Sequence, residues 1–471
     1  MDTQKLRQRI LDLAIRGKLV PQDPNDEPAS VLLDRIRAEK ERLIAEGKLK
    51  RPKAKKSTDK SHYQNFTPPF DIPTSWEWVR LEDICFVITD GDHQAPPKAN
   101  DGIPFLVISD IITGIIKFDK CRYVPVEYYS NLETYRKPSK GDILFTVTGS
   151  YGKSVIVETD KRFCFQRHIG LIKPILITKY LNIVLCSEYI KKECDAKATG
   201  TAQKTVGLES LRNFYIPIPP LSEQLRIIDQ CQICEELLIK IDVGKKLLGA
   251  LIEASKSKIL DLAMQGKLVP QDPADEPATD MLRRINPNAK IITDNPHSWN
   301  IPNGWCWVMV SDVFAPMQRK LPEGDNFWYI DIDSVDNKRN VAYPKNICTT
   351  TAPSRASRFT QKGDVVFSMV RPYLRNIALV PEDDCIASTG FYVFHPLDAI
   401  LSKYSYILTL SSFFVDGLNS FMKGDNSPSI NKNNVESFVI PLPPLNEQKR
   451  IVAKIEDLYS VLDEIEASLR S

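Results

Sequence analysis

The chain has 471 residues, which is too long for one ordinary hydrophobic core and predicts two or three domains. Its 42% hydrophobic and 26% charged residues, with no apolar run of membrane-spanning length and no signal peptide in MDTQKLRQRI, predict a soluble cytoplasmic protein without membrane contact. Ten cysteines predict reduced thiols, and the net charge of +2 is well below that of a protein that binds nucleic acid alone.

Residues 1–45 are predicted to form the N-terminal part of a split helical spacer, because Leu6, Ile10 and Leu13 follow steps of four and three. The motif GKLVPQDP follows at residues 17–24, where Gly17 and the prolines after it mark a helix end. Residues 46–71 are predicted to be a linker. Its basic stretch KLKRPKAKKSTDK is typical of a solvated tether, with contact to phosphates as the alternative.

Residues 72–221 are predicted to form a first mixed α/β domain. Short β-branched and aromatic runs such as FLVISDII and DILFTVTG are separated by turn residues, and a helical stretch is predicted near residues 180–194. The segment GSYGKS is not a phosphate-binding loop, because that motif needs glycine where Val147 stands. No sequence motif in this segment indicates a catalytic site.

Residues 222–285 are predicted to be a central helical spacer. Residues from Ile227 to Leu262 follow alternating steps of four and three, the period of a coiled-coil seam. A helix of this extent would be about 54 Å long. Cys231 and Cys234 have metal-ligand spacing, but no second pair has zinc-site spacing and both fall on the seam, which favours packing over metal binding.

Residues 286–300 are predicted to be a linker, and residues 301–444 a second mixed α/β domain with a helical stretch near residues 404–418. The acidic run IDIDSVDNK at residues 330–338 favours an alternating strand over a set of nuclease carboxylates. Residues 445–471 are predicted to be the C-terminal helix that completes the split spacer. Its predicted seam comprises Ile451, Ile455, Leu458, Leu462, Ile465 and Leu469.

Four pairs of similar segments show that the chain contains a duplication. GKLVPQDP returns at residues 266–273, IPTSWEWV (72–79) returns as IPNGWCWV (301–308), KGDILF (140–145) as KGDVVF (362–367), and IPIPPLSEQLRI (216–227) as IPLPPLNEQKRI (440–451). The intact helical copy, residues 219–266, spans 48 residues, and the copy split between the two ends of the chain spans 46. The sequence therefore predicts an α+β fold class. Two mixed α/β domains are separated by an antiparallel coiled coil of long helices, in a circular pseudo-two-fold repeat.

One candidate binding loop follows each KGD motif. TVTGSYGKS and SMVRPYLRN align so that Tyr151 matches Tyr373, Lys153 matches Arg375, and Gly149 faces Arg371, with Ser150 in the same loop. A positive charge kept in both domains suits contact with phosphate, and the change from glycine to arginine suits a change of recognised base, since arginine favours guanine. Ordinary turns at strand ends are the alternative.

The order of two unlike domains and two like spacers, with the SEQLRI and NEQKRI boxes, resembles the specificity subunit of a Type I restriction-modification enzyme over essentially the whole chain. The resemblance implies a subunit without catalytic site that recognises a bipartite DNA sequence, one half per target-recognition domain. It implies as partners double-stranded DNA, two methyltransferase subunits and restriction or motor subunits. No cofactor or metal is expected in this chain. S-adenosylmethionine, ATP and Mg are expected on the partners, in a holoenzyme that is an adenine DNA methyltransferase and ATP-dependent endonuclease.

The resemblance also implies further DNA-contacting loops. TGTAQKTV (199–206) and KGDNSPSI (423–430) precede the boxes, and side chains that only satisfy their own loop are the alternative there. TDGDHQAPP (89–97) resembles a family loop near the start of the first domain, and its counterpart near residues 318–320 is not similar in sequence. The candidate residues in or directly after these segments are Asp90, His93, Gln94, Thr201, Gln203, Lys204, Arg319, Lys320, Asn426, Ser427 and Asn431.

Two other functions remain open from the sequence. The same subunit would serve a complex that only methylates DNA. A coiled-coil scaffold with two protein-binding domains would also suit the nearly neutral charge, although the paired boxes argue against it.

Overall fold

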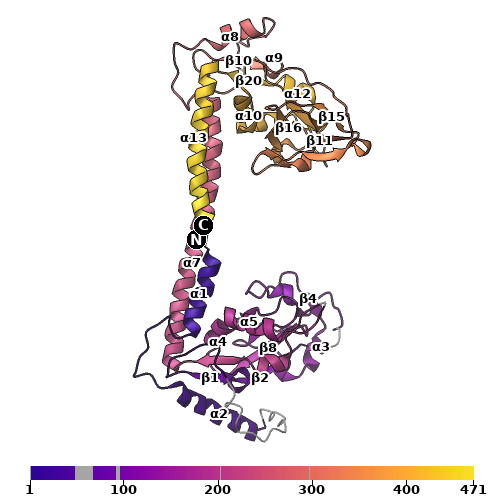
Figure 1. Ribbon diagram of the computed structural model, residues 1–471. Helices are drawn as coiled ribbons and strands as arrows, with labels where there is room; N and C mark the ends of the chain where they lie inside the picture. The colour runs from indigo at the N-terminus through magenta and orange to yellow at the C-terminus, as the bar shows by residue number, and fades with distance from the viewer. Residues whose placement is uncertain (1, 48–66, 92–95, 202, 296, 471) are drawn as a thin grey trace. The chain divides into compact units, whose positions relative to one another are not determined.

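The computed structural model describes residues 2–47, 67–91, 96–201, 203–295 and 297–470 (Figure 1). These residues form two compact units, Asp2–Gly244 and Lys245–Ser471, and helix α7 (Leu221–Met264) runs from the first unit into the second. Most of the predicted linker 46–71, including all of its basic stretch 48–60, lies outside the described residues.

The first globular domain contains three small sheets. A four-stranded antiparallel sheet has the order β2-β8-β5-β6, and a three-stranded sheet has the order β4-β3-β7. The third sheet pairs the WEWV segment with the IPIP segment, because β1 lies antiparallel to β9. The strands are β1 (Glu77–Arg80), β2 (Cys85–Asp90), β3 (Ile103–Leu106), β4 (Arg122–Val124), β5 (Ile143–Thr146), β6 (Ser154–Ile156), β7 (Cys164–Phe165), β8 (Ile169–Pro174) and β9 (Tyr215–Ile218). The helices are α3 (Val126–Asn131), α4 (Thr178–Leu185), α5 (Glu188–Lys197) and α6 (Leu208–Arg212).

The second globular domain has the same plan with more strands. Its sheets have the orders β10-β20, β14-β11-β18-β15 and β12-β13-β17-β16-β19. The strands are β10 (Cys306–Met309), β11 (Asn326–Ile330), β12 (Val335–Asp336), β13 (Val341–Ala342), β14 (Lys345–Cys348), β15 (Ala356–Phe359), β16 (Val365–Ser368), β17 (Ile377–Leu379), β18 (Cys385–Ser388), β19 (Phe391–Phe394) and β20 (Val439–Leu442). The helices are α8 (Ala278–Ile285), α9 (Val310–Val313), α10 (Ser402–Leu410), α11 (Ser412–Asn419) and α12 (Lys432–Glu436).

Only parts of the acidic run at residues 330–338 form the predicted strand, because Ile330 ends β11 and Val335–Asp336 form β12. Asp331 instead caps a short 3-10 helix, Ile332–Ser334, by accepting a hydrogen bond from the Ser334 N–H at 2.9 Å. Asp331 also pairs with Lys345 at 2.8 Å. Side-chain capping of the backbone therefore prevails over the alternating pattern.

In the first unit, helix α1 (Thr3–Ile15) packs antiparallel against the N-terminal half of α7 (Figure 1). Thr3 donates to Asp242 at 2.7 Å, and Arg7 pairs with both Asp242 and Glu235, so α7 numbering falls as α1 numbering rises. Ala14 and Ile15 are buried in the same core as Ile227. Leu6, which was predicted to lie on the seam, is 37% exposed. Hydrogen bonds and ion pairs of Thr3 and Arg7 therefore form part of the contact between α1 and α7, where the spacing of apolar residues predicted hydrophobic packing.

In the second unit, helix α13 (Leu445–Arg470) packs antiparallel against the C-terminal half of α7. The Tyr459 hydroxyl donates to the Lys256 carbonyl at 3.0 Å, and Lys256 pairs with Asp463 at 2.6 Å. Ile451 and Ile455 are buried as predicted, whereas Ile465 is exposed. On α7 the seam moves by one residue after Ile252. Leu260 and Ala263 are buried there, whereas the predicted seam residues Ile259 and Leu262 are only partly buried.

Gly17 and Gly266 end α1 and α7 as predicted. Both have positive φ, +65° and +67°, and the following lysine N–H donates back to the carbonyl of Leu13 or Leu262, at 2.9 and 2.8 Å. This pattern is the Schellman helix end, which favours glycine. A Cβ at Gly17 would lie 2.5 Å from a Pro73 ring carbon, so the close packing of the next segment also excludes a larger residue.

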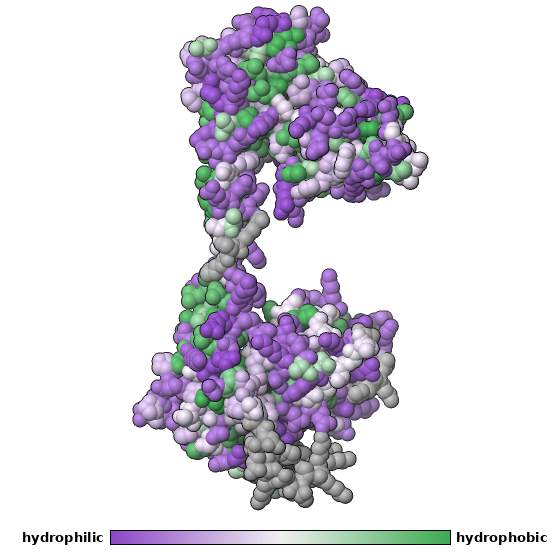
Figure 2. Space-filling view, viewed as in Figure 1, coloured by the Kyte–Doolittle hydropathy of each residue, from purple (hydrophilic) through white to green (hydrophobic). Residues whose placement is uncertain are grey.

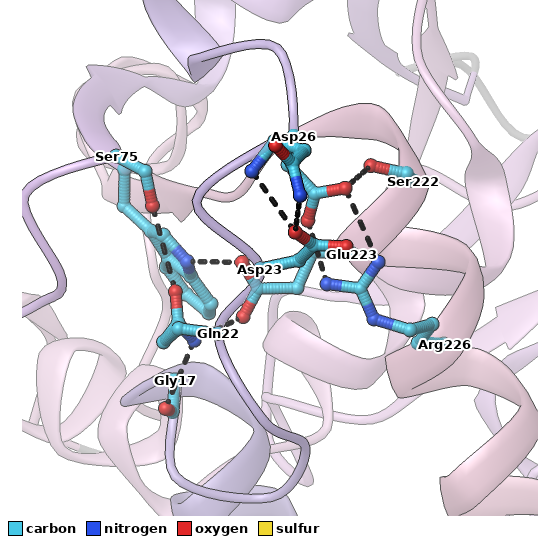
Figure 3. Close-up of polar contacts among 10 residues, drawn as sticks. Gly17, Gln22, Asp23, Asp26, Ser75, Ser222, Glu223 and Arg226 are labelled. Atoms are coloured by element: carbon cyan, nitrogen blue, oxygen red, sulfur yellow. Dashed lines mark hydrogen bonds and ion pairs between the residues drawn. The ribbon is translucent and has the colours of Figure 1, made fainter.

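The repeated motifs form a buried joint between helix and domain in each unit. In the first, Trp76 Nε1 donates to Glu223 at 2.9 Å, and Gln22 of GKLVPQDP donates to the other Glu223 oxygen at 2.5 Å (Figure 3). Arg226 pairs with Asp26 at 2.6 Å, and Ser222 also donates to Asp26. Burial raises the pKa of Glu223 above its ordinary value, although the hydrogen bonds from Trp76 and Gln22 act in the opposite direction.

The second joint repeats the tryptophan, glutamine and arginine contacts of the first. Trp305 and Gln271 donate to the two Glu447 oxygens at 2.9 and 2.8 Å, and Arg450 pairs with Asp275 at 2.7 Å. The duplicated octapeptide and the SEQ and NEQ boxes are therefore the parts of one joint, used twice. Each joint fixes a globular domain to its pair of helices.

Candidate nucleic-acid interface

In the first domain, two of the predicted loops lie side by side. We name residues 147–153, between β5 and β6, the hairpin loop, and residues 199–205, after α5, the closing loop. A β-bridge pairs Thr148 with Thr205, and the Gly149 N–H donates to the Lys204 carbonyl at 2.9 Å. Two backbone hydrogen bonds between Thr199 and Thr205, of 3.0 and 2.8 Å, close the second loop on itself. The two sequence candidates thus form one surface.

The hairpin and closing loops border an open hollow of about 490 Å³. The predicted residues Ser150, Lys153, Thr201, Gln203 and Lys204 are all exposed. Helix α5 adds a lysine that sequence reasoning missed, because nothing in EYIKKECDAK marks one lysine as facing a loop. The lining residues are Gly149, Ser150, Tyr151, Gly152, Lys153, Lys191, Asp195, Gln203 and Lys204.

Tyr151 attaches the hairpin loop to helix α5. Its hydroxyl donates to the Asp195 carboxylate at 2.7 Å, and this hydrogen bond raises the pKa of Tyr151. Asp195 is the one acidic side chain among the lining residues, and Lys153, Lys191 and Lys204 outnumber it, so positive charge predominates in the hollow.

The segment that begins at Asp90 starts at the same end of the sheet. Asp90 is the last residue of β2 and pairs with Gly170, whose neighbour Ile169 pairs with Thr146 at the start of the hairpin loop. His93 and Gln94 lie outside the described residues. The first domain therefore brings together the starts of all three predicted segments.

The second domain contains the same pair of loops. Here residues 369–376 are the hairpin loop and residues 423–429 the closing loop. Val370 bridges Ser429, the Arg371 N–H donates to the Pro428 carbonyl at 2.8 Å, and two bonds of 3.0 Å between Lys423 and Ser429 close the loop. Of the predicted residues, Arg371, Tyr373, Asn426 and Ser427 are exposed.

The predicted match of Lys153 with Arg375 is wrong. Phe145 of β5 faces Ser154 of β6, whereas Phe367 of β16 faces Ile377 of β17, so the second hairpin loop is one residue longer. Lys153 thus corresponds to Asn376 of the second domain. A one-residue insertion is invisible when an ungapped match is made from sequence alone.

Arg375 corresponds to Gly152, and both have positive φ, +55° and +81°. The Arg375 guanidinium donates to the Leu410 carbonyl at 2.6 Å and to the Ser412 hydroxyl at 3.3 Å, where α10 ends and α11 begins. Its positive charge is engaged with helix ends inside the domain, which argues against the predicted phosphate contact.

Three other candidates are placed less favourably. Asn431 caps α12 by accepting from the Asn434 N–H at 3.0 Å. The backbone of Arg319 forms an isolated β-bridge with Arg358 of β15, and Lys320 Nζ lies 3.4 Å from the carboxylate of Asp384. β15 belongs to a different sheet from β16 and β17, which flank the hairpin loop, and the contacts of Arg319 and Lys320 are with residues in or next to that other sheet.

Within the described ranges, no group of three or more His, Cys, Asp or Glu side chains is placed to hold a metal ion. Among the helices described, none combines the length and apolar character needed to cross a bilayer. Cys231 and Cys234 lie on α7, and burial raises the pKa of Cys231 to about 12, which disfavours the thiolate that binds metals.

Comparison with known proteins identifies the family. The family model for the Type I restriction modification DNA specificity domain matches twice, at residues 73–245 and 303–471. The chain is 28% identical to the EcoAI specificity subunit and 27% identical to the EcoEI specificity subunit, both Type I restriction enzymes of Escherichia coli. In each case the match covers 99% of this chain and 91% of the relative.

A solved structure from work on complex assembly and conformational transition of the type I R-M system has the same fold. Its TM-score is 0.54 at 21% identity, over 85% of this chain and 96% of that chain. With two matches to the family model that together cover more than half of its residues, the chain belongs to the family of Type I restriction-modification DNA specificity subunits.

Proposed function

We propose that the protein recognises a bipartite DNA sequence, one half per target-recognition domain, and directs a methyltransferase and a restriction enzyme to it without catalysing either reaction. The observation that carries the proposal is the repeated pair of loops. Both domains hold a hairpin loop and a closing loop together by equivalent backbone hydrogen bonds, yet the exposed side chains differ. Shared backbone hydrogen bonds with variable side chains suit two domains that recognise different sequences.

The charge distribution supports a DNA partner at these loops. Lys153, Lys191 and Lys204 line one hollow of the first domain, although the whole chain carries only +2. Phosphate contacts require local positive charge, and partner subunits can supply the remainder. Affinity for DNA should therefore be higher in the assembled complex than for this chain alone.

The methyltransferase subunits would bind the helices. Each unit exposes large apolar side chains on its part of α7, and Figure 2 shows hydrophobic residues at the surface of the helices. Helix–helix association buries such side chains, which cost free energy while exposed to water. In the first unit they are Leu225, Ile233, Leu237, Ile239 and Val243, and in the second Leu247, Leu248 and Leu251. One methyltransferase subunit bound to each unit would cover both sets of exposed apolar side chains.

The remaining components belong to the partners in this proposal. S-adenosylmethionine would be bound by the methyltransferase, which transfers a methyl group to adenine, and ATP and Mg by the motor and nuclease subunits. The complex would act in the cytoplasm, where the DNA lies.

The test is to purify the chain with its methyltransferase subunit and incubate the complex with S-adenosylmethionine and a randomised double-stranded DNA library. We expect the methylated molecules to share two short specified segments separated by a fixed number of unspecified bases. Methylation of one continuous sequence, or of no particular sequence, would contradict the proposal. ATP-dependent cleavage after addition of a motor subunit separates a restriction complex from one that only methylates.

A further inference from the structure

The loop pairs of the two domains can be matched residue by residue. Both closing loops have seven residues, are closed by the same pair of backbone bonds, and contain glycine at the second position with φ of +107° and +102°. Gln203 in the first domain therefore corresponds to Ser427 in the second. In the hairpin loops, Gly149 and Arg371 correspond, because both have positive φ and both donate to the closing loop.

At these two facing positions the domains exchange a large and a small residue. The first domain combines Gly149 with Gln203, and the second combines Arg371 with Ser427. A Cβ added to Gly149 would lie 3.2 Å from the Gln203 amide nitrogen, so the Gln203 side chain lies against the space that the glycine leaves. Each domain thus places one long polar side chain at the junction of its two loops, from opposite sides of that junction.

Both long side chains are exposed, and that of Arg371 is also held in place. Arg371 has φ of +49°, a conformation that costs a non-glycine residue free energy, and its N–H is fixed to Pro428. One guanidinium N–H donates to the Asn426 carbonyl at 2.8 Å, and an arginine has five such donors. The hydrogen bonds that fix the backbone of the loops fix the position of Arg371 as well.

The two side chains have different hydrogen-bonding chemistry. A glutamine amide offers one acceptor and donors, which match N6 and N7 of adenine, whereas arginine offers two parallel donors, which match O6 and N7 of guanine. We infer that Gln203 recognises an adenine in the half-site of the first domain and that Arg371 recognises a guanine at the equivalent place in the other half-site. The inference rests on the proposed function and adds to it the residue and the base.

The test uses the assembled complex with its methyltransferase subunit and a randomised double-stranded DNA library. Gln203→Ser should reduce the preference for adenine at one position of one half-site by roughly 5- to 150-fold and leave the other half unchanged. Arg371→Ala should do the same to a guanine in the other half. The double variant Gly149→Arg with Gln203→Ser transfers the second domain's pair to the first. It should replace that adenine by guanine.

The results separate this inference from the proposed function. A wild-type complex that selects no bipartite sequence contradicts the proposed function. A wild-type complex that selects one, and keeps both halves unchanged in Gln203→Ser and Arg371→Ala, contradicts the inference alone. Both single changes alter exposed side chains, so they decide the question even where the double variant does not assemble.

Discussion

The indole of Trp305 donates a hydrogen bond to the buried carboxylate of Glu447 at 2.9 Å, and Trp76 makes the same contact with Glu223 at the same distance. The repeated sequence thus conserves a polar joint as well as a hydrophobic pattern. Because the two joints sit in separate units, each can be changed while the other serves as its control.

Trp305→Phe should destabilise the second unit. The change leaves an oxygen of Glu447, which is 1% exposed, without its donor, and an orphaned buried acceptor costs about 1–3 kcal/mol. Calorimetry should show a lower transition temperature for the second unit only. Trp76→Phe should lower the transition of the first unit instead. Equal effects of either change on both transitions would contradict two independent joints.

Asp275→Asn should make the stability of the second unit less dependent on pH in the acidic range. The hydrogen bond from Arg450 lowers the pKa of Asp275 below its ordinary value of 3.8, so the unfolded chain binds a proton more readily than the folded one. The resulting stability is present above the unfolded pKa and is lost as pH falls through the folded pKa.

The difference in transition temperature between wild type and Asp275→Asn should therefore be constant near neutral pH and shrink below about pH 4. Asp280→Asn is the matched control, since Asp280 is exposed and lies 3.7 Å from Arg283 on the same helix. A difference that grows in acid would contradict the role given to the Arg450–Asp275 pair.

Lys153→Ala should weaken binding to every DNA sequence without changing the recognised sequence. Lys153 is exposed beside the hollow of the first domain, where it suits phosphate contact. The slope of log affinity against log salt should fall by about one unit. Lys290→Ala removes an exposed lysine elsewhere and should leave the slope unchanged. An unchanged slope in Lys153→Ala would rule out the phosphate contact.

Arg375→Ala should destabilise the second unit and leave the salt slope unchanged. Its guanidinium holds Leu410 and Ser412 at the junction of α10 and α11. Loss of these bonds should lower the transition temperature of the second unit, measured by calorimetry. A fall of one unit in salt slope with no loss of stability would restore the phosphate contact that the sequence predicted.

Leu251→Glu should weaken association with the methyltransferase subunit. Leu251 is 53% exposed on α7, and a carboxylate there cannot be buried against an apolar partner without a large cost. Sedimentation of the mixed subunits should show a reduced fraction of complex. Ile115→Glu, which alters an exposed apolar residue of the first globular domain, should leave the fraction unchanged. Full association of Leu251→Glu would place the methyltransferase elsewhere.

The large features of the fold follow from sequence because they depend on periodic patterns. The seam at Ile451 and Ile455 and the helix ends at Gly17 and Gly266 were predictable in this way. Details that depend on tertiary contacts were not. Leu6 is exposed because Thr3 and Arg7 face α7 with polar groups, and no period encodes that exchange.

The candidate site shows the same division. The pairing of Gly149 with Arg371 was predictable because both follow a matched KGD motif, and that of residues 199–206 with 423–430 because both precede a matched box. The position of Lys191 and the inward direction of Arg375 were not, because they depend on where α5 and α10 pack.

The most direct test of the account is an exchange of residues 301–443 for the same segment of a relative that recognises a different sequence. The boundary strands β10 and β20 lie within this segment, and Glu447 lies outside it, so the relative is chosen to have a tryptophan at the position of Trp305, which keeps the joint to the helix. Methylation mapping of the assembled complex should then show one half of the recognised sequence replaced and the other half unchanged. A change in both halves, or in neither, would contradict the assignment of one half-site to each domain.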